Sequence, residues 1–280
     1  MPLARLLRAL PDAVPRLLAF ALALVFVYPL ALMLLESLQA PGARSATRAL
    51  FVGLPTLESW RLAFAGVPLA RGLLNSMAVA ALALPLTLAI AALGGFALTQ
   101  ISRRAQALAV TLLLLSASIP LTAVWIPRFV LFESLGLVGT WAPLIAPALA
   151  GGSPVFVLLY FLALRRVPSD LVEAARLEGL GWLALWWQVM LPLVRPTTVA
   201  VGLLAFVQVW GNFMEAVLYL KSPATQTAPL LLHALDLMGP TQWTVLMAGA
   251  CAVTAPVVVA FLLLQKFLVA NEREGSWSGR

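Results

Sequence analysis

Six long apolar stretches dominate this sequence and constrain its fold more than any other feature. A helix that crosses a bilayer needs ~20 mostly apolar residues, and the stretches of about this length are residues 17–35, 72–98, 105–127, 141–164, 197–219 and 243–269. Charged residues make up only 10% of the chain and the mean hydropathy is +0.99, whereas a soluble chain carries ~25% charged residues. We therefore expect an all-α fold, a polytopic bundle of six transmembrane helices with lipid as the solvent for much of its surface.

Prolines and glycines interrupt several of these stretches: Pro29, Pro85, Pro120, Pro154, Pro256 and the pair Gly151-Gly152. Such breaks persist in a bilayer where neighbouring helices satisfy the freed backbone groups, so they favour a bundle over isolated anchors. The first stretch ends in LMLLESLQA, a poor cleavage site, and is expected to be a span and not a signal peptide. The sequence predicts one transmembrane domain over residues 1–280, with its core at 72–269.

The lysines and arginines predict the orientation, because they concentrate on the cytoplasmic side of membrane proteins. With a cytoplasmic N-terminus, twelve of the 18 fall inside: Arg5, Arg8, Arg16, Arg103, Arg104, Arg165, Arg166, Arg176, Arg195, Lys266, Arg273 and Arg280. Six fall outside: Arg44, Arg48, Arg61, Arg71, Arg128 and Lys221. The short loop ISRR between the second and third stretches favours this orientation most strongly. Both termini and the segment 165–195 are then expected to be cytoplasmic.

Composition gives little support to several other classes of protein. Cys251 and His233 are the single cysteine and histidine, so an internal disulfide is impossible and no cluster of metal ligands is visible. The arginines are scattered among apolar runs, which does not suggest a nucleic-acid partner. The sequence has no G-x-x-x-x-G-K-[ST] phosphate loop. We expect no catalytic residue, metal or cofactor in this chain, and no ATP hydrolysis of that kind by the chain alone.

The segment 165–195, between the fourth and fifth stretches, is strongly charged for so apolar a chain. Ser169 or Asp170 can cap a helix that follows Pro168, and acids lie in its first turn, as the helix dipole favours. Gly179 and Gly181 stop or turn the chain. We expect a helix–turn–helix across the inner face of the membrane.

The second half of this segment reads as another short helix from Trp182 to Met190, and Pro192 and Pro196 prevent its simple continuation into the fifth span. In the first half, Ala174 and Ala175 leave one helix face bare, so that another surface can approach closely. Glu173 beside them offers a charge to an arginine. The alternative interpretation is an amphipathic helix resting on lipid headgroups, and the residues alone leave both open.

The spacing in this segment resembles a known motif. It reads Glu173-Ala174-Ala175, three residues, Gly179, nine residues, then Val189-Met190-Leu191-Pro192. This resembles the EAA loop of the inner-membrane permease subunits of bacterial ABC importers, whose pattern is EAA-x3-G-x9-I-x-L-P. The departures are Val189 for the isoleucine and Glu178 where an aspartate is common. A pattern of this length with fixed gaps is specific.

Three further stretches resemble sugar permeases of the maltose-transporter type, in particular the second permease. NSMAVAALALPL resembles the family's second span, and IPRFVLFESLGLVGTWAPLI resembles the segment joining its third and fourth spans. VWGNFMEAVLYL resembles its W-N-x-F stretch, with Gly211 inserted between Trp210 and Asn212. Together these stretches cover the chain from Asn75 to about Leu231.

The resemblance implies a role for the cytoplasmic segment as the coupling helix that docks in a groove of an ATPase subunit. The implied coupling residues are Glu173, Ala174, Ala175, Glu178, Gly179 and Pro192. The implied partners are an ATPase dimer that binds ATP and Mg, a second permease chain, and an extracytoplasmic solute-binding protein. The implied location is the bacterial inner membrane, and the implied solute is a carbohydrate, with a polyol or glycerol phosphate as alternatives.

Polar residues in the fifth stretch are candidates for the translocation path. Asn212 and Glu215 are expected to face that path, because polar groups in a membrane usually face the bundle interior. Trp210 and Phe213 flank them, and aromatic faces suit sugar rings. Asn75 and Arg128 are instead expected to lie at the membrane interface, their side chains reaching water.

Two other classes of membrane protein fit this sequence less well. A secondary transporter would need buried residues for a coupling ion, and no repeated pattern of broken helices with paired acids is visible. A membrane enzyme would need a catalytic cluster at one membrane face, and the acids of segment 165–195 have no nearby histidine or cysteine. Both are less favoured than an importer permease.

Overall fold

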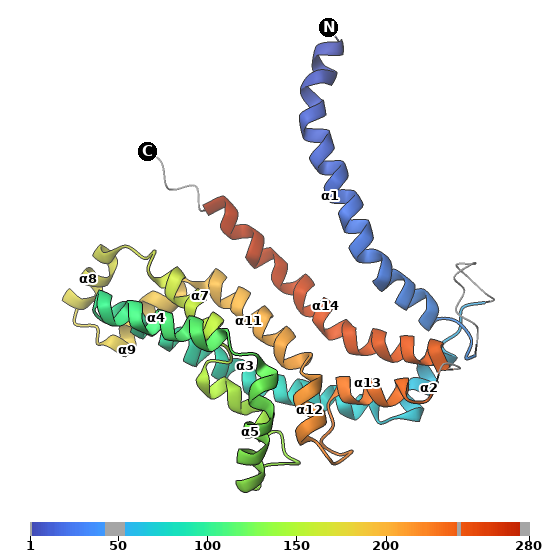
Figure 1. Cartoon of the computed structure of the whole chain (residues 1–280). Coiled ribbons are helices and arrows are strands. Elements are labelled where there is room, and N and C mark those ends of the chain that lie inside the picture. The colour runs from blue at the N-terminus through green and yellow to red at the C-terminus, as the bar shows by residue number, and fades with distance from the viewer. Residues whose placement is uncertain (1, 43–53, 240–241, 275–280) are drawn as a thin grey trace. The chain divides into compact units, whose positions relative to one another are not determined.

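The computed structural model describes residues 2–42, 54–239 and 242–274, with side chains from 15 to 267 inside these ranges. These described residues form helices and no strand (Figure 1). The helices are α1 (Pro2–Ser37), α2 (Glu58–Gly66), α3 (Leu69–Gln100), α4 (Arg103–Ala117), α5 (Leu121–Ser134), α6 (Ala142–Ile145), η1 (Ala146–Ala150), α7 (Pro154–Leu164), α8 (Ser169–Leu177), α9 (Trp182–Ala184), η2 (Leu185–Met190), α10 (Leu191–Leu193), α11 (Arg195–Trp210), α12 (Phe213–Tyr219), α13 (Ala228–Asp236) and α14 (Trp243–Glu274). Of the arginines used to predict the orientation, Arg44, Arg48 and Arg280 lie outside the described residues.

Within the described residues, four helical segments are long and apolar enough to cross a membrane: Pro15–Ser37, Leu69–Gln100, Ala142–Leu164 and Trp243–Phe267. Two bent pairs raise the number to six if each pair is one span, and these are Arg103–Ala117 with Leu121–Ser134, and Trp182–Leu193 with Arg195–Trp210. The all-helical membrane fold predicted from the sequence is confirmed. The count of six spans stays a prediction, as does the assignment of residues 1–280 to one domain.

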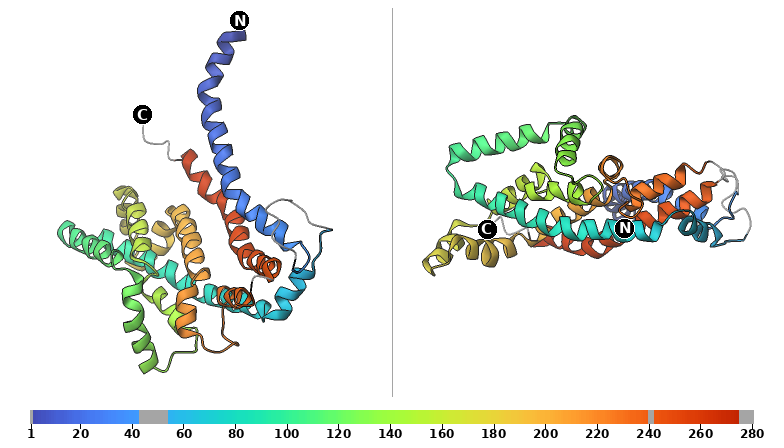
Figure 2. Two further views of the ribbon diagram at one scale, coloured as in Figure 1. Left: turned by 45° about the vertical axis from the view of Figure 1, so that its right-hand side comes forward. Right: turned by 90° about the horizontal axis from the view of Figure 1, so that it is seen from below.

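The predicted span 105–127 is not one straight helix. The chain bends by 88° between α4 and α5, and both views of Figure 2 show the two helices running in different directions. Pro120 occupies the N-cap position of α5 in extended backbone, where a residue without an N–H group costs no hydrogen bond. The predicted fifth span is also interrupted, because α11 ends at Trp210 and α12 begins at Phe213.

The chain divides into two compact units, which are described separately. The first comprises Met1–Leu69 and Leu232–Thr254, and the second comprises Ala70–Leu231 and Ala255–Arg280. In the first unit the Ser59 hydroxyl donates to the backbone oxygen of Gln39 at 2.7 Å and lies 3.0 Å from the Thr244 hydroxyl. Trp60 Nε1 donates to the Ser37 hydroxyl at 3.2 Å. These buried contacts join α1, α2 and α14.

The core of the second unit depends on a close approach of α3 and α7. A Cβ atom at Gly95 would lie 2.6 Å from Tyr160 Cβ and 2.8 Å from the backbone nitrogen of Phe161. Only a residue without a side chain allows this distance between the two helices. Tyr160 is fully buried there, in an apolar cluster that continues to Ala175 on α8 and Leu185 on η2.

Candidate functional site

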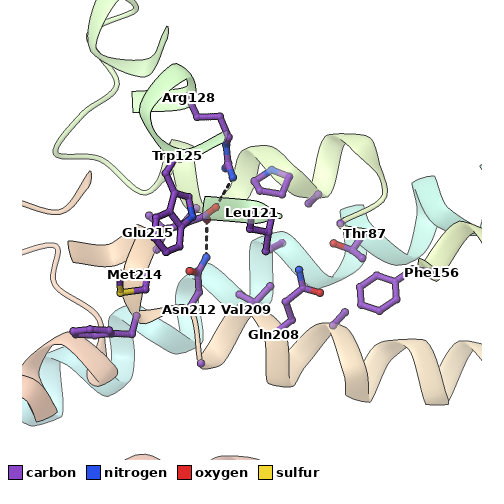
Figure 3. A pocket seen from close by; sticks show the side chains of 18 residues that line it. Thr87, Leu121, Trp125, Arg128, Phe156, Gln208, Val209, Asn212, Met214 and Glu215 are labelled. Carbon is purple, nitrogen blue, oxygen red and sulfur yellow. Dashed lines mark hydrogen bonds and ion pairs between the residues drawn. The ribbon is translucent and has the colours of Figure 1, made fainter. Parts of the chain in front are cut away.

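A cavity of about 300 Å³ opens within the second unit between α3, α5, α11 and α12. We call it the α5–α12 cavity, and Figure 3 shows its side chains. Its polar lining groups are Thr87, Arg128, Gln208, Asn212 and Glu215, and its aromatic ones are Trp125, Phe156 and Phe213. This volume is at the low end of the range of small-molecule sites.

The break between α11 and α12 positions the acid of this cavity. Gly211 ends α11, and the backbone N–H of Phe213 donates to the oxygen of Gly211 at 2.8 Å, so a tight turn separates the two helices. Glu215 follows in the first turn of α12, where the partial positive charge of a helix N-terminus favours a carboxylate. Asn212 Nδ2 donates to Glu215 Oε2 at 2.7 Å.

Arg128 on α5 forms an ion pair with the other oxygen of this carboxylate, so that Glu215 lies between Arg128 and Asn212 (Figure 3). The side chains of Arg128 and Glu215 are 21% and 8% exposed. A second guanidinium nitrogen lies 3.4 Å from the backbone oxygen of Pro143. The expectation that Arg128 lies at the interface is therefore wrong, because a buried carboxylate on another helix attracts it into the cavity.

Asn75 also differs from the interfacial expectation. Its side chain is buried, and Nδ2 donates to the backbone oxygens of Ala224 at 3.0 Å and Gln226 at 2.8 Å. The neighbouring Ser76 hydroxyl accepts from the backbone N–H of Ala228 at 2.9 Å. Two side chains at the start of α3 thus bind backbone atoms in and next to the connection between α12 and α13. We call this connection, residues 220–227, the α12–α13 loop.

Trp210 does not belong to the set of described residues that line the cavity. Its ring is buried against Phe206, with centroids 5.4 Å apart, in a cluster that includes Ala80 on α3. Sequence reasoning missed Trp125, which comes from α5 and lines the cavity instead. The sequence signal for it was an aromatic residue two positions before Pro127, directly before the stretch that begins IPRFV and resembles the family.

The charged segment forms α8, a turn and the short helices α9, η2 and α10, of which η2 is a π-helix. Gly179 has a φ of +85°, the left-handed conformation that glycine adopts without strain. The backbone N–H of Leu180 donates to the backbone oxygen of Ala175 at 3.2 Å, and the N–H of Gly179 donates to the backbone oxygen of Arg176 at 3.0 Å. This is the pattern of a glycine-terminated helix.

The start of α8 differs from the predicted cap. Pro168 occupies the N-cap position and no side chain caps the helix. The Ser169 hydroxyl instead contacts Asp170 Oδ1 at 3.3 Å. The predicted second break is present, because the chain bends by 84° between the segments Trp182–Leu193 and Arg195–Trp210. Pro192 lies in the first turn of α10, just before this bend.

The two alanines of the motif have different surroundings. Ala175 is buried in the apolar cluster with Leu185, Trp186 and Met190, so it contacts its own chain. Ala174, Glu173 and Glu178 are exposed. The expectation of one bare face carrying both alanines is therefore wrong for Ala175, because the turn at Gly179 folds η2 back onto that side of α8.

Two features of this segment had no sequence signal of their own. Arg176 Nη2 donates to Gln100 Oε1 at 2.6 Å and connects α8 to the end of α3. Large apolar side chains are exposed next to Glu178, with Leu177 90% and Trp182 68% exposed. Such a surface is usual where a protein meets a partner or a membrane.

Comparison with known proteins gives consistent matches. Residues 87–273 match the family described as "Binding-protein-dependent transport system inner membrane component". The chain is 29% identical over 229 residues to the sulfoquinovosyl glycerol transport system permease protein SmoH of Agrobacterium fabrum, covering 82% of this chain and 80% of that one. It is 29% identical over 268 residues to the galactooligosaccharides transport system permease protein GanQ of Bacillus subtilis, covering 94% of each.

Among solved structures, a bacterial ABC transporter involved in the import of the acidic polysaccharide alginate has a chain that superposes with a TM-score of 0.76. The two chains are 18% identical, and the match covers 92% of this chain and 96% of that one. At this level of identity the likeness shows a shared fold.

Proposed function

The chain belongs to the family of binding-protein-dependent transport system inner membrane components, and on that premise we propose that it forms half of the translocation path of an ATP-driven carbohydrate importer. The observation that carries the proposal is a cavity between broken helices whose apolar lining includes a few polar and aromatic side chains, in a chain whose relatives SmoH and GanQ are permeases for sugar-containing solutes. A polyol or glycerol phosphate is the alternative solute.

We further propose that α8 and the turn after it couple this chain to a separate ATPase. Glu173, Ala174 and Glu178 are exposed on α8, and the same segment exposes the large apolar side chains of Leu177 and Trp182. In this proposal Glu173 pairs with a basic residue of the ATPase, and Ala174 permits close contact. ATP and Mg bind to the partner and not to this chain.

The role of the other motif residues is internal in this proposal. Ala175 packs α8 on η2, Gly179 sets the turn, and Pro192 precedes the bend into α11. Together they transmit a displacement of α8 to α11. The break at 211–212 then transmits this displacement to the α5–α12 cavity. Asn212 and Glu215 line the path of the solute, and Trp210 packs α11 against α3 in the cluster with Ala80.

The remaining partners and the orientation follow from the same proposal. A second permease chain forms the other half of the path, and an extracytoplasmic binding protein delivers the solute. Both termini and residues 165–195 are cytoplasmic, as the arginine distribution favours. Single cysteines placed at Arg103 and Thr225, in a Cys251→Ala background, should label from opposite sides of the membrane; labelling of both from outside would contradict this orientation.

Reconstitution tests the proposal as a whole. The chain is co-expressed with an ATPase, a second permease and a binding protein from its own source organism, and the purified complex is placed in proteoliposomes. We expect solute uptake that requires ATP and stops when the lysine of the ATPase phosphate loop is replaced. Uptake by this chain alone, without ATP and driven by an ion gradient, would show a secondary transporter instead.

A further inference from the structure

We propose that the α5–α12 cavity receives a neutral sugar ring and rejects an anionic one. The inference rests on the proposed function and narrows its solute class. Arg128 and Glu215 are the two ionisable residues among the described residues that line the cavity. They pair with each other, so their charges cancel inside the site.

The cation of this cavity already has its counter-ion. One guanidinium nitrogen of Arg128 contacts Glu215, and another lies 3.4 Å from the backbone oxygen of Pro143. The second oxygen of Glu215 accepts from Asn212 at 2.7 Å. A carboxylate or phosphate on the solute would have to displace Glu215 from Arg128 or lie beside it. Charges repel more strongly in a partly buried site than in bulk water, because less solvent screens them.

The groups that remain suit an uncharged, hydroxyl-rich ligand. Thr87 and Gln208 present a hydroxyl and an amide to the cavity, and the rings of Trp125 and Phe156 line it (Figure 3). Amides and hydroxyls can each donate and accept hydrogen bonds, and a sugar ring has hydroxyls at its rim and an apolar face. A volume of about 300 Å³ fits one unit of a solute better than a long chain.

A protection assay on the assembled complex tests this without knowledge of the natural solute. Leu121→Cys, in a Cys251→Ala background, introduces a thiol at an exposed apolar position of the cavity lining. Its rate of alkylation by uncharged N-ethylmaleimide is measured with methyl glucoside or methyl glucuronide, and with the two galactose counterparts. Each pair differs by one carboxylate at C6.

With Arg128 and Glu215 intact, we expect at least one neutral glycoside to protect the thiol at a concentration at least tenfold lower than its acidic counterpart. Glu215→Gln leaves Arg128 without its counter-ion, so this preference should fall at least tenfold. Arg128→Gln leaves the carboxylate, so the acidic glycosides should stay excluded. The double variant Arg128→Gln/Glu215→Gln restores neutrality and should restore the preference.

Equal protection by both members of each pair, or protection by neither, would overturn the inference. This comparison is made with Arg128 and Glu215 intact, so it does not depend on whether the charge variants fold. An unchanged preference in Glu215→Gln would also overturn it. ATPase activity of the same complexes, measured with and without the binding protein, separates the two proposals and needs no identified solute. Absence of stimulation by the binding protein contradicts the proposed function, whereas normal stimulation with equal protection contradicts only the neutral-sugar site.

Discussion

Arg128 on α5 and Glu215 on α12 form an ion pair although 87 positions separate them in the sequence. The ion pair connects α5, the second helix of the bent pair α4 and α5, to α12, the short helix that follows the break at 211–212. Because both side chains are largely buried, each depends on the other for compensation of its charge.

Removing one partner of this pair should destabilise the complex more than removing both. A broken buried pair costs ~3–5 kcal/mol and an exposed pair ~0–1 kcal/mol, so with 21% and 8% exposure we expect about 1–3 kcal/mol for Arg128→Gln alone. The double variant with Glu215→Gln should recover at least half of the loss. Thermal unfolding of the purified complex measures this cycle, and equal, additive losses would mean that the pair contributes nothing.

Asn75→Asp should loosen the α12–α13 loop. The change keeps the size of the side chain but replaces the Nδ2 donor by an acceptor, which then faces the backbone oxygens of Ala224 and Gln226. An unpaired buried polar group costs ~1–3 kcal/mol, so amide hydrogen exchange in residues 222–228 should accelerate about tenfold or more. Asn75→Ala should give a smaller change, since it removes the donor without adding repulsion. Exchange at α7 serves as the internal control.

Glu173→Lys and Ala174→Trp should uncouple ATP hydrolysis from transport while leaving the chain folded, because both side chains are exposed. Glu173→Lys adds repulsion to a basic groove, and Ala174→Trp adds bulk without charge. A helix that merely rests on anionic lipid would tolerate the lysine. Solute-stimulated ATPase activity and uptake by proteoliposomes are the measurements; normal coupling in both variants would eliminate α8 as the docking surface.

Gly179→Ala should destabilise the turn after α8, and Gly181→Ala should not. Gly179 has a φ of +85°, whereas Gly181 has a φ of −66°, and neither has an atom within 4 Å of the position of an added Cβ. Left-handed backbone costs a residue with a side chain ~1–2 kcal/mol, so Gly179→Ala and the bulkier Gly179→Val should lower the unfolding temperature. Similar unfolding temperatures for Gly179→Ala and Gly181→Ala would show that the turn relaxes without cost.

The fold was largely predictable because its signals are local. Apolar runs gave the helical membrane class, the pair Pro192 and Pro196 marked the bend before α11, and Gly179 marked a turn. Pro120 was recognised as a break, but the 88° bend at it was not predicted, because hydropathy records how apolar a stretch is and not its direction.

The candidate site was less predictable because it depends on contacts between distant segments. Asn212 and Glu215 were identified from their position in an apolar run, and both line the cavity. Arg128 was misplaced, since no single sequence reveals that a carboxylate on α12 lies within its reach. Trp210 was taken as a lining residue because it neighbours Asn212, but the break at 211–212 changes the helix face and turns its ring toward Phe206.

The opposite surroundings of Ala174 and Ala175 have a consequence for genetics. Under the proposed docking of α8 on an ATPase, Ala175 is selected for the fold of this chain, whereas Ala174 is selected for contact with the ATPase. Compensating changes in the ATPase should therefore rescue substitutions at Glu173 and Ala174 in an allele-specific way. No ATPase allele should rescue a bulky residue at Ala175, whose suppressors should arise within this chain, at Leu185 or Met190.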